Sequence, residues 1–116
     1  STNVTRVFSV ATVEVPVLRA GDVDAALEVA SRVVRELRDD PDIAEHIPPD
    51  VPPELWLTAL TVDGTTLRVQ QRVVAGKHGV VADALRRRLV GALAARSIAT
   101  QRWDTPLSIA RDPRVT

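Results

Sequence analysis

The sequence predicts an α+β fold in which two helices cover one face of a four-stranded antiparallel sheet. Segments 22–37 and 79–93 carry apolar residues at helical spacing, while segments 7–17 and 65–74 alternate apolar and polar residues, as half-buried strands do. An Asp-Gly pair at 63–64 between two strand-like segments is typical of a hairpin. The length of 116 residues fits one domain of this kind.

The first strand is expected at residues 7–17, with Ala11, Val13, Val15 and Val17 on its buried side. Pro16 lacks an N–H donor, so it belongs near the end or the edge of a strand.

The first helix is expected to follow the turn at residues 19–21, with Asp22 as its N-cap. Pro41 marks its end. Its apolar positions follow one helical stripe: Val23, Ala26, Leu27, Ala30, Val33, Val34 and Leu37.

Residues 39–54 are expected to form a stiff connector, because it carries two Pro-Pro pairs. Within it, Ile43, Ala44 and Ile47 are spaced for a short turn of helix. A second strand at 55–62 and a third at 65–74 then form the hairpin. The third strand divides its side chains between two faces, with Leu67, Val69 and Val73 on one and Arg68, Gln70 and Arg72 on the other.

The second helix is expected to begin near Gly79, and Gly91 weakens it by about 1 kcal/mol relative to alanine. Its apolar stripe consists of Val81, Ala84, Leu85, Leu89, Ala92 and Leu93, and three arginines, Arg86, Arg87 and Arg88, lie largely off that stripe. A short last strand is expected at about 98–102.

This order is the βαββαβ pattern of the ferredoxin-like sandwich, with two helices on one face of the sheet. We expect the sandwich to span residues 7–103. The C-terminal tail, 104–116, carries Leu107 and Ile109, which are able to pair as one more strand.

The motifs of common catalytic sites are incomplete in this chain. The sequence around Gly76 and Lys77 suggests a phosphate-binding loop, but Gln71 stands where the first glycine of that motif belongs and His78 where its hydroxyl belongs. We expect a tight strand-to-helix turn instead. No Ser-His-Asp arrangement stands out, and the acylphosphatase pair of Arg and Asn would need Arg19 with Asn3, the single asparagine, far from it.

Metal and nucleic-acid sites are also not expected. The chain has no cysteine, and its two histidines, His46 and His78, lack ligands at metal-binding spacing, so both are expected to be exposed. RNA-binding sheets stack bases on aromatic residues, yet the third strand has none. Trp56 and Trp103 are expected in the core or at an interface. The sequence therefore predicts no enzyme activity, no cofactor and no nucleic-acid partner.

Charge is distributed unevenly along a chain whose net charge is zero. Residues 1–58 carry 5 basic and 11 acidic side chains, a net of −6, whereas residues 59–116 carry 10 and 4, a net of +6. Either these charges are solvated singly, or the acidic side of one copy meets the basic side of another. No apolar run approaches the roughly 18 residues of a membrane span.

Residues 52–93 resemble the C-terminal cytoplasmic domain of the small-conductance mechanosensitive channel (MscS) family. The resemblance is carried by the segment PPELWLTALTVDGTTLRVQQRVVAGKHGVVADALRRRLVGAL. As in that family, a Pro-containing linker leads into an apolar strand, a hairpin, an L-R-V-like strand, a turn and a helix. Residues 3–27, NVTRVFSVATVEVPVLRAGDVDAAL, fit the family's passage from its middle β domain into a strand and helix. The resemblance therefore implies that residues 1–6 are the exit from a preceding β domain. Residues 95–101 lack the Gly and Pro usual there in the family.

The resemblance implies a cytoplasmic vestibule, or cage, domain of a bacterial ion channel. Such domains form a ring of identical subunits beneath the inner membrane, with side portals through which ions pass, and membrane attachment comes from transmembrane segments outside this sequence. Five arginines are candidate interface or portal residues: Arg68, Arg72, Arg86, Arg87 and Arg88. The alternative is a stand-alone ferredoxin-like regulatory domain that binds a small ligand, with the turn from Arg19 to Asp22 as one place for it.

Overall fold

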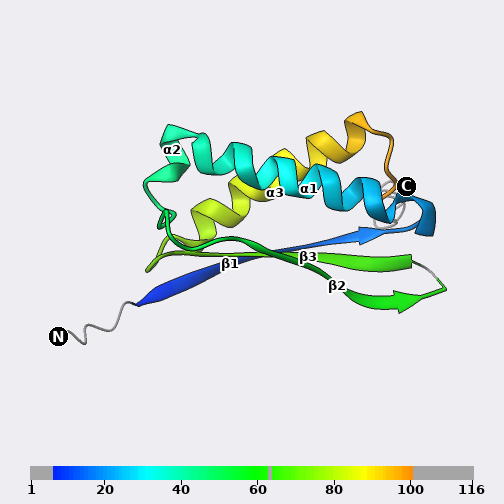
Figure 1. The fold of residues 1–116 in the computed structure, drawn as a ribbon, viewed down its shortest axis with the longest axis horizontal. Helices are drawn as coiled ribbons and strands as arrows, with labels where there is room; N and C mark the ends of the chain where they lie inside the picture. The colour runs from blue at the N-terminus through cyan, green and yellow to red at the C-terminus, as the bar shows by residue number, and fades with distance from the viewer. Residues whose placement is uncertain (1–6, 63, 101–116) are drawn as a thin grey trace, which may run out of the picture.

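The computed structural model describes residues 7–62 and 64–100 and shows a three-stranded antiparallel sheet with helices on one face (Figure 1). The elements, in chain order, are β1 (Phe8–Val17), the 3-10 turn η1 (Ala20–Asp22), α1 (Val23–Asp39), α2 (Pro41–Ala44), β2 (Glu54–Thr61), β3 (Gly64–Val74) and α3 (His78–Ala95). The strand order is β1-β3-β2, so β3 is central. The predicted α+β class and the one-sided helix layer are confirmed.

The sheet has three strands in the described part of the chain rather than the four expected. Residues 98–100 are not in a strand. The rest of the expected last strand, Trp103 and the tail from 104 lie outside the described residues, as does the segment 1–6. The chain after α3 does meet β1, because Leu18 N donates to Ala99 O at 3.1 Å.

The alternation predicted for β1 and β3 is confirmed. The apolar residues on one side of both strands are buried beneath α1 and α3, and the registered pairs Val13–Val69 and Val15–Leu67 lie at the centre of this core. Gln71 breaks the apolar pattern: it occupies an inward position on β3 and is 2% exposed. It pairs with Ala11, whose small side chain limits the crowding at this position.

Helix α1 follows the predicted stripe, and six of its apolar residues are buried. Asp22, however, does not cap it with a side-chain hydrogen bond. Asp22 ends the preceding 3-10 turn with φ −94° and ψ −3°, a helical backbone rather than the extended one from which a capping side chain turns back. Its carboxylate instead lies 3.7 Å from Nε of Arg19.

Pro41 ends α1, as predicted, and also begins α2. Asp40 separates the two helices, and its side chain accepts a hydrogen bond from Asp42 N at 2.9 Å, which caps α2. Proline suits the first turn of a helix, because the N–H that it lacks has no partner there. The predicted helical turn is confirmed, and it buries Ile43 and Ile47 against the main core.

The β2–β3 hairpin is confirmed, with Thr61 of β2 paired to Gly64 of β3. A β-bulge interrupts the ladder, since Leu57 pairs with Leu67 but Leu60 pairs with Thr65. The Thr65 hydroxyl donates to Ala59 O, which satisfies a carbonyl that the bulge removes from the regular ladder.

Helix α3 begins after a turn in which Gly76 adopts φ +84°. In this turn Gly76 N donates to Ser9 Oγ at 2.8 Å and Lys77 N to Val74 O at 2.9 Å. The predicted strand-to-helix turn is therefore confirmed. The stripe of α3 is also as predicted, because the residues that it buries are Val81, Leu85, Leu89 and Leu93.

Gly64 is the position where a side chain is least tolerated. Its φ is +119°, and an added Cβ would lie 2.1 Å from Val17 O on β1.

We expect Gly64→Ala to lower the free energy of unfolding by more than about 1 kcal/mol, measured by urea denaturation. Gly91→Ala, in the open at mid-α3, should raise it by about 1 kcal/mol. Equal effects of the two substitutions would contradict this account.

Candidate functional site

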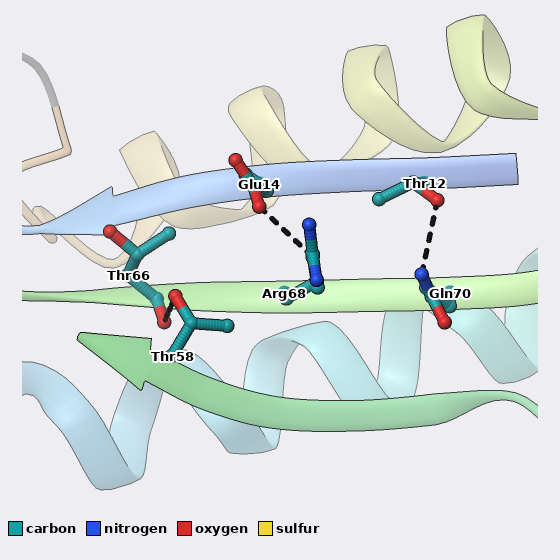
Figure 2. A network of polar contacts seen from close by, with 6 residues as sticks. All are labelled: Thr12, Glu14, Thr58, Thr66, Arg68 and Gln70. Carbon is teal, nitrogen blue, oxygen red and sulfur yellow. Dashed lines mark hydrogen bonds and ion pairs between the residues drawn. The ribbon is translucent and has the colours of Figure 1, made fainter.

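The sheet face opposite the helices carries a row of polar and charged side chains, and we call it the open face. Successive side chains along a strand point to opposite faces of the sheet. The residues that alternate with the core residues therefore have their side chains on the open face. Figure 2 views this face, with the helices behind the sheet. Its polar residues include Thr12, Glu14, Thr66, Arg68 and Gln70 on the paired strands β1 and β3.

Arg68 lies at the centre of the open face between two partners on opposite strands. Its Nε is 2.9 Å from Glu14 Oε2 on β1, and its guanidinium lies 5.8 Å from the ring centre of Trp56 on β2. The N–H is not directed at the oxygen, so the contact is an ion pair without a hydrogen bond. Trp56 is thus half-buried on the open face under a cation, and not in the core.

Arg72, two residues further along β3, has no ion pair with any described residue. Its guanidinium lies 5.8 Å from the ring centre of Phe8, at the start of β1. Arg72 itself pairs with Val10 of β1 in the ladder. The guanidinium is therefore held toward β1, and its charge is not neutralised by a carboxylate in the described part of the chain.

A cavity of about 270 Å³ lies beside Arg72 where the connector meets the sheet. It is lined by Val10, Val51, Pro52, Glu54, Gln70 and Arg72. It therefore has one cation, one anion, one amide and three apolar walls, drawn from all three strands and the connector.

A buried polar contact holds the connector wall of this cavity in place. Arg38 Nη1, near the end of α1, donates to Val51 O at 2.7 Å and to Gln71 Oε1 at 2.9 Å. Gln71 Nε2 donates to the same Val51 carbonyl at 3.2 Å and to Arg72 O at 2.8 Å. We call this set the Arg38–Gln71 brace. This role of Gln71 was not predicted. The sequence did contain a sign of it, because Gln71 is a polar residue on an otherwise apolar face of its strand.

The five candidate arginines do not form one patch. Arg68 and Arg72 lie on the open face, whereas Arg86, Arg87 and Arg88 lie on α3, on the other side of the sheet. Arg87 forms an ion pair with Asp83 at 3.0 Å on its own helix. Arg88 forms an ion pair with Asp40, which ties α3 to the end of α1. Arg86 has no ion pair with a described residue, and it borders a mostly apolar groove between α3 and β1.

Charge is partly balanced inside one chain. Three ion pairs join the acidic first half to the basic second half: Arg68–Glu14, Arg88–Asp40 and Arg96–Glu28. The halves interleave in both layers, since β1 pairs with β3 and α1 packs on α3. The charge asymmetry of the sequence therefore does not translate into two separate surfaces of opposite sign.

The histidines differ from each other in environment. His78 is exposed at the start of α3, as predicted. His46 is not: its side chain is 18% exposed, because the backbone carbonyl of this residue accepts Val74 N at 2.9 Å and fixes it against β3. In residues 7–62 and 64–100, no group of three His, Asp or Glu side chains is arranged to hold a metal ion.

The chain matches no protein-family model, and no curated protein is significantly similar to it in sequence. Within the described residues, neither α1 nor α3 nor any shorter helix combines the length and apolarity that crossing a bilayer requires.

The Arg38–Gln71 brace predicts a measurable coupling. We expect Arg38→Met and Gln71→Leu each to lower the free energy of unfolding, with a coupling of roughly 0.5–3 kcal/mol in a double-mutant cycle. The physical reason is that each residue satisfies polar groups that the other leaves buried. Arg35→Met, on the exposed side of the same helix, is the control. Strict additivity of the two substitutions would show that the contact does not brace the connector.

Proposed function

We propose that this chain is the cytoplasmic vestibule, or cage, domain of a mechanosensitive ion channel. The observation that carries the proposal is the resemblance of residues 52–93 to that domain of the small-conductance family, together with the matching passage at 3–27. The α+β layer of two long helices on one sheet face is consistent with it. The role needs no catalytic chemistry: it needs a rigid unit that associates with copies of itself and presents charge to passing ions.

The domain would support ring assembly through its polar surfaces. Of the five candidates, Arg72 and Arg86 are the better portal or interface residues, because Arg68, Arg87 and Arg88 each have an ion-pair partner within the chain. Arg86 and Arg72 have no carboxylate partner among the described residues, so each is available to a neighbouring subunit or an ion. A ring held by such contacts weakens as salt screens the charges.

The complete product of the gene, expressed in membranes that lack other mechanosensitive channels, tests this function. We expect tension-activated currents in patch recordings, and we expect Arg86→Glu to change the ratio of cation to anion permeability. Arg87→Glu is the matched control, since that side chain already faces Asp83. A gene product without any apolar span of about 20 residues, or membranes without tension-activated current, would refute the channel assignment.

We further propose that the sandwich is ferredoxin-like, with residues after Thr100 forming the fourth strand beside β1. The hydrogen bond from Leu18 N to Ala99 O supports this proposal, because it brings the chain after α3 to the end of β1. A groove of about 300 Å³ runs there between β1 and α3, with walls that include Val13, Val15 and Val90. An open, mostly apolar groove beside a free strand edge favours a strand as its occupant.

Amide hydrogen exchange tests the fourth strand residue by residue. The N–H of Leu18 points away from β3, toward the outer edge of β1. Because N–H groups alternate between the two edges of a strand, those of Glu14 and Thr12 point to the same outer edge. Pro16 lies between Glu14 and Leu18 and has no N–H. We expect slow exchange at Glu14 and Thr12, independent of protein concentration. Val13 and Val15 are the controls, because their N–H groups point toward β3 and are expected to exchange slowly in either case. Fast exchange at Glu14 and Thr12 alone would exclude a fourth strand.

A further inference from the structure

The cavity on the open face is lined by two side chains of opposite charge, Glu54 and Arg72. Glu54 of β2 pairs with Gln70 of β3, and Arg72 lies two residues further along β3 on the same face. Such diagonal neighbours have Cα atoms about 7–8 Å apart. No ion pair joins these two side chains, and the stacking of Arg72 on Phe8 holds the guanidinium toward β1, away from Glu54. The two charges are therefore separated across the cavity.

Gln70 adds a directed acceptor between them. Its Nε2 donates to Thr12 Oγ1 at 3.4 Å. Figure 2 shows this nitrogen turned toward β1 and the amide oxygen turned the opposite way, toward β2. Glu54 pairs with Gln70 across the ladder, so the oxygen of Gln70 is turned toward the strand that carries Glu54. This side accepts hydrogen bonds, whereas the Arg72 side donates them.

The remaining walls are apolar and fixed. Val10 is 46% exposed, a large value for a valine beside a core. Val51 and Pro52 form the wall from the connector. The Arg38–Gln71 brace holds the Val51 carbonyl through two donors, so this wall does not need to be ordered when a ligand binds.

We infer that this cavity binds a small zwitterion, specifically an α-amino acid with an aliphatic side chain. Its carboxylate contacts the Arg72 guanidinium, its ammonium group contacts Glu54 and the oxygen of Gln70, and its side chain covers Val10, Val51 and Pro52. Guanidinium and carboxylate form directional, charge-assisted hydrogen bonds. Since both charged residues are exposed, the affinity is expected to be modest, with a Kd on the order of 1 mM. This site does not depend on the channel function.

Titration of the isotope-labelled full chain with L-leucine, followed by amide NMR, tests the inference. We expect saturable shifts at residues 10, 51, 54, 70 and 72. Isocaproate lacks the ammonium group and isoamylamine lacks the carboxylate, so both should bind more weakly than leucine. Arg72→Gln should weaken leucine binding roughly fivefold, as loss of a partly exposed ionic contact does, but leave isoamylamine unchanged. Glu54→Gln should weaken leucine binding and leave isocaproate unchanged.

Arg35→Gln, which removes an exposed charge on α1 far from the cavity lining, is the control and should bind leucine as the unmodified chain does. If Arg72→Gln loses its folded spectrum, Glu54→Gln with isocaproate still decides the matter. The inference is overturned if leucine causes no saturable shifts at the cavity, if neither substitution weakens it, or if isocaproate binds as tightly as leucine. None of these outcomes bears on tension-activated current.

Discussion

The pairing of β3 on both of its edges is the constraint on which the rest of this structure depends. With β1 on one side and β2 on the other, its register fixes which side chains face the helices and which face away. A slip of one residue would move Leu67 and Val69 out of the core and bring Arg68 into it. Burying that charge without its partners would cost several kcal/mol. The apolar core and the polar open face are therefore two consequences of one register.

Gln71 connects these two sides. It lies on the buried side of β3, where its neighbours are valine and leucine, yet its amide meets Arg38 of α1 and the Val51 carbonyl of the connector. The connector is thus held by a polar contact at the edge of the core, and not by apolar burial alone. Because Val51 and Pro52 then continue onto the open face, this buried amide also determines the shape of a surface cavity.

The arginines illustrate how the fold assigns different roles to similar residues. Arg68 is held between a carboxylate and an indole, and Arg88 ties the two long helices together. The Arg72 guanidinium lies over a phenyl ring and has no ion pair with a described residue. Partly exposed ion pairs contribute little to stability. The functional interest therefore lies with Arg72 and Arg86, whose charges no described carboxylate neutralises. These two lie on different sides of the sheet, so a subunit contact at Arg86 and ligand binding at Arg72 would use separate surfaces.

Periodicity by itself determined the strands, the two long helices, the hairpin and the core residues, because a spacing of two or 3.6 residues fixes which side chains share a face. Only the tertiary structure decided the features that depend on contacts between residues distant in sequence, such as the environment of His46, the brace and the cavity. The capping role expected of Asp22 failed because a 3-10 turn placed its backbone in a helical conformation. His46 became half-buried because its carbonyl met Val74. The cavity beside Arg72 and the brace at Gln71 were not predictable, because only the packed structure brings their segments together. The cavity joins all three strands and the connector, and the brace joins α1, the connector and β3.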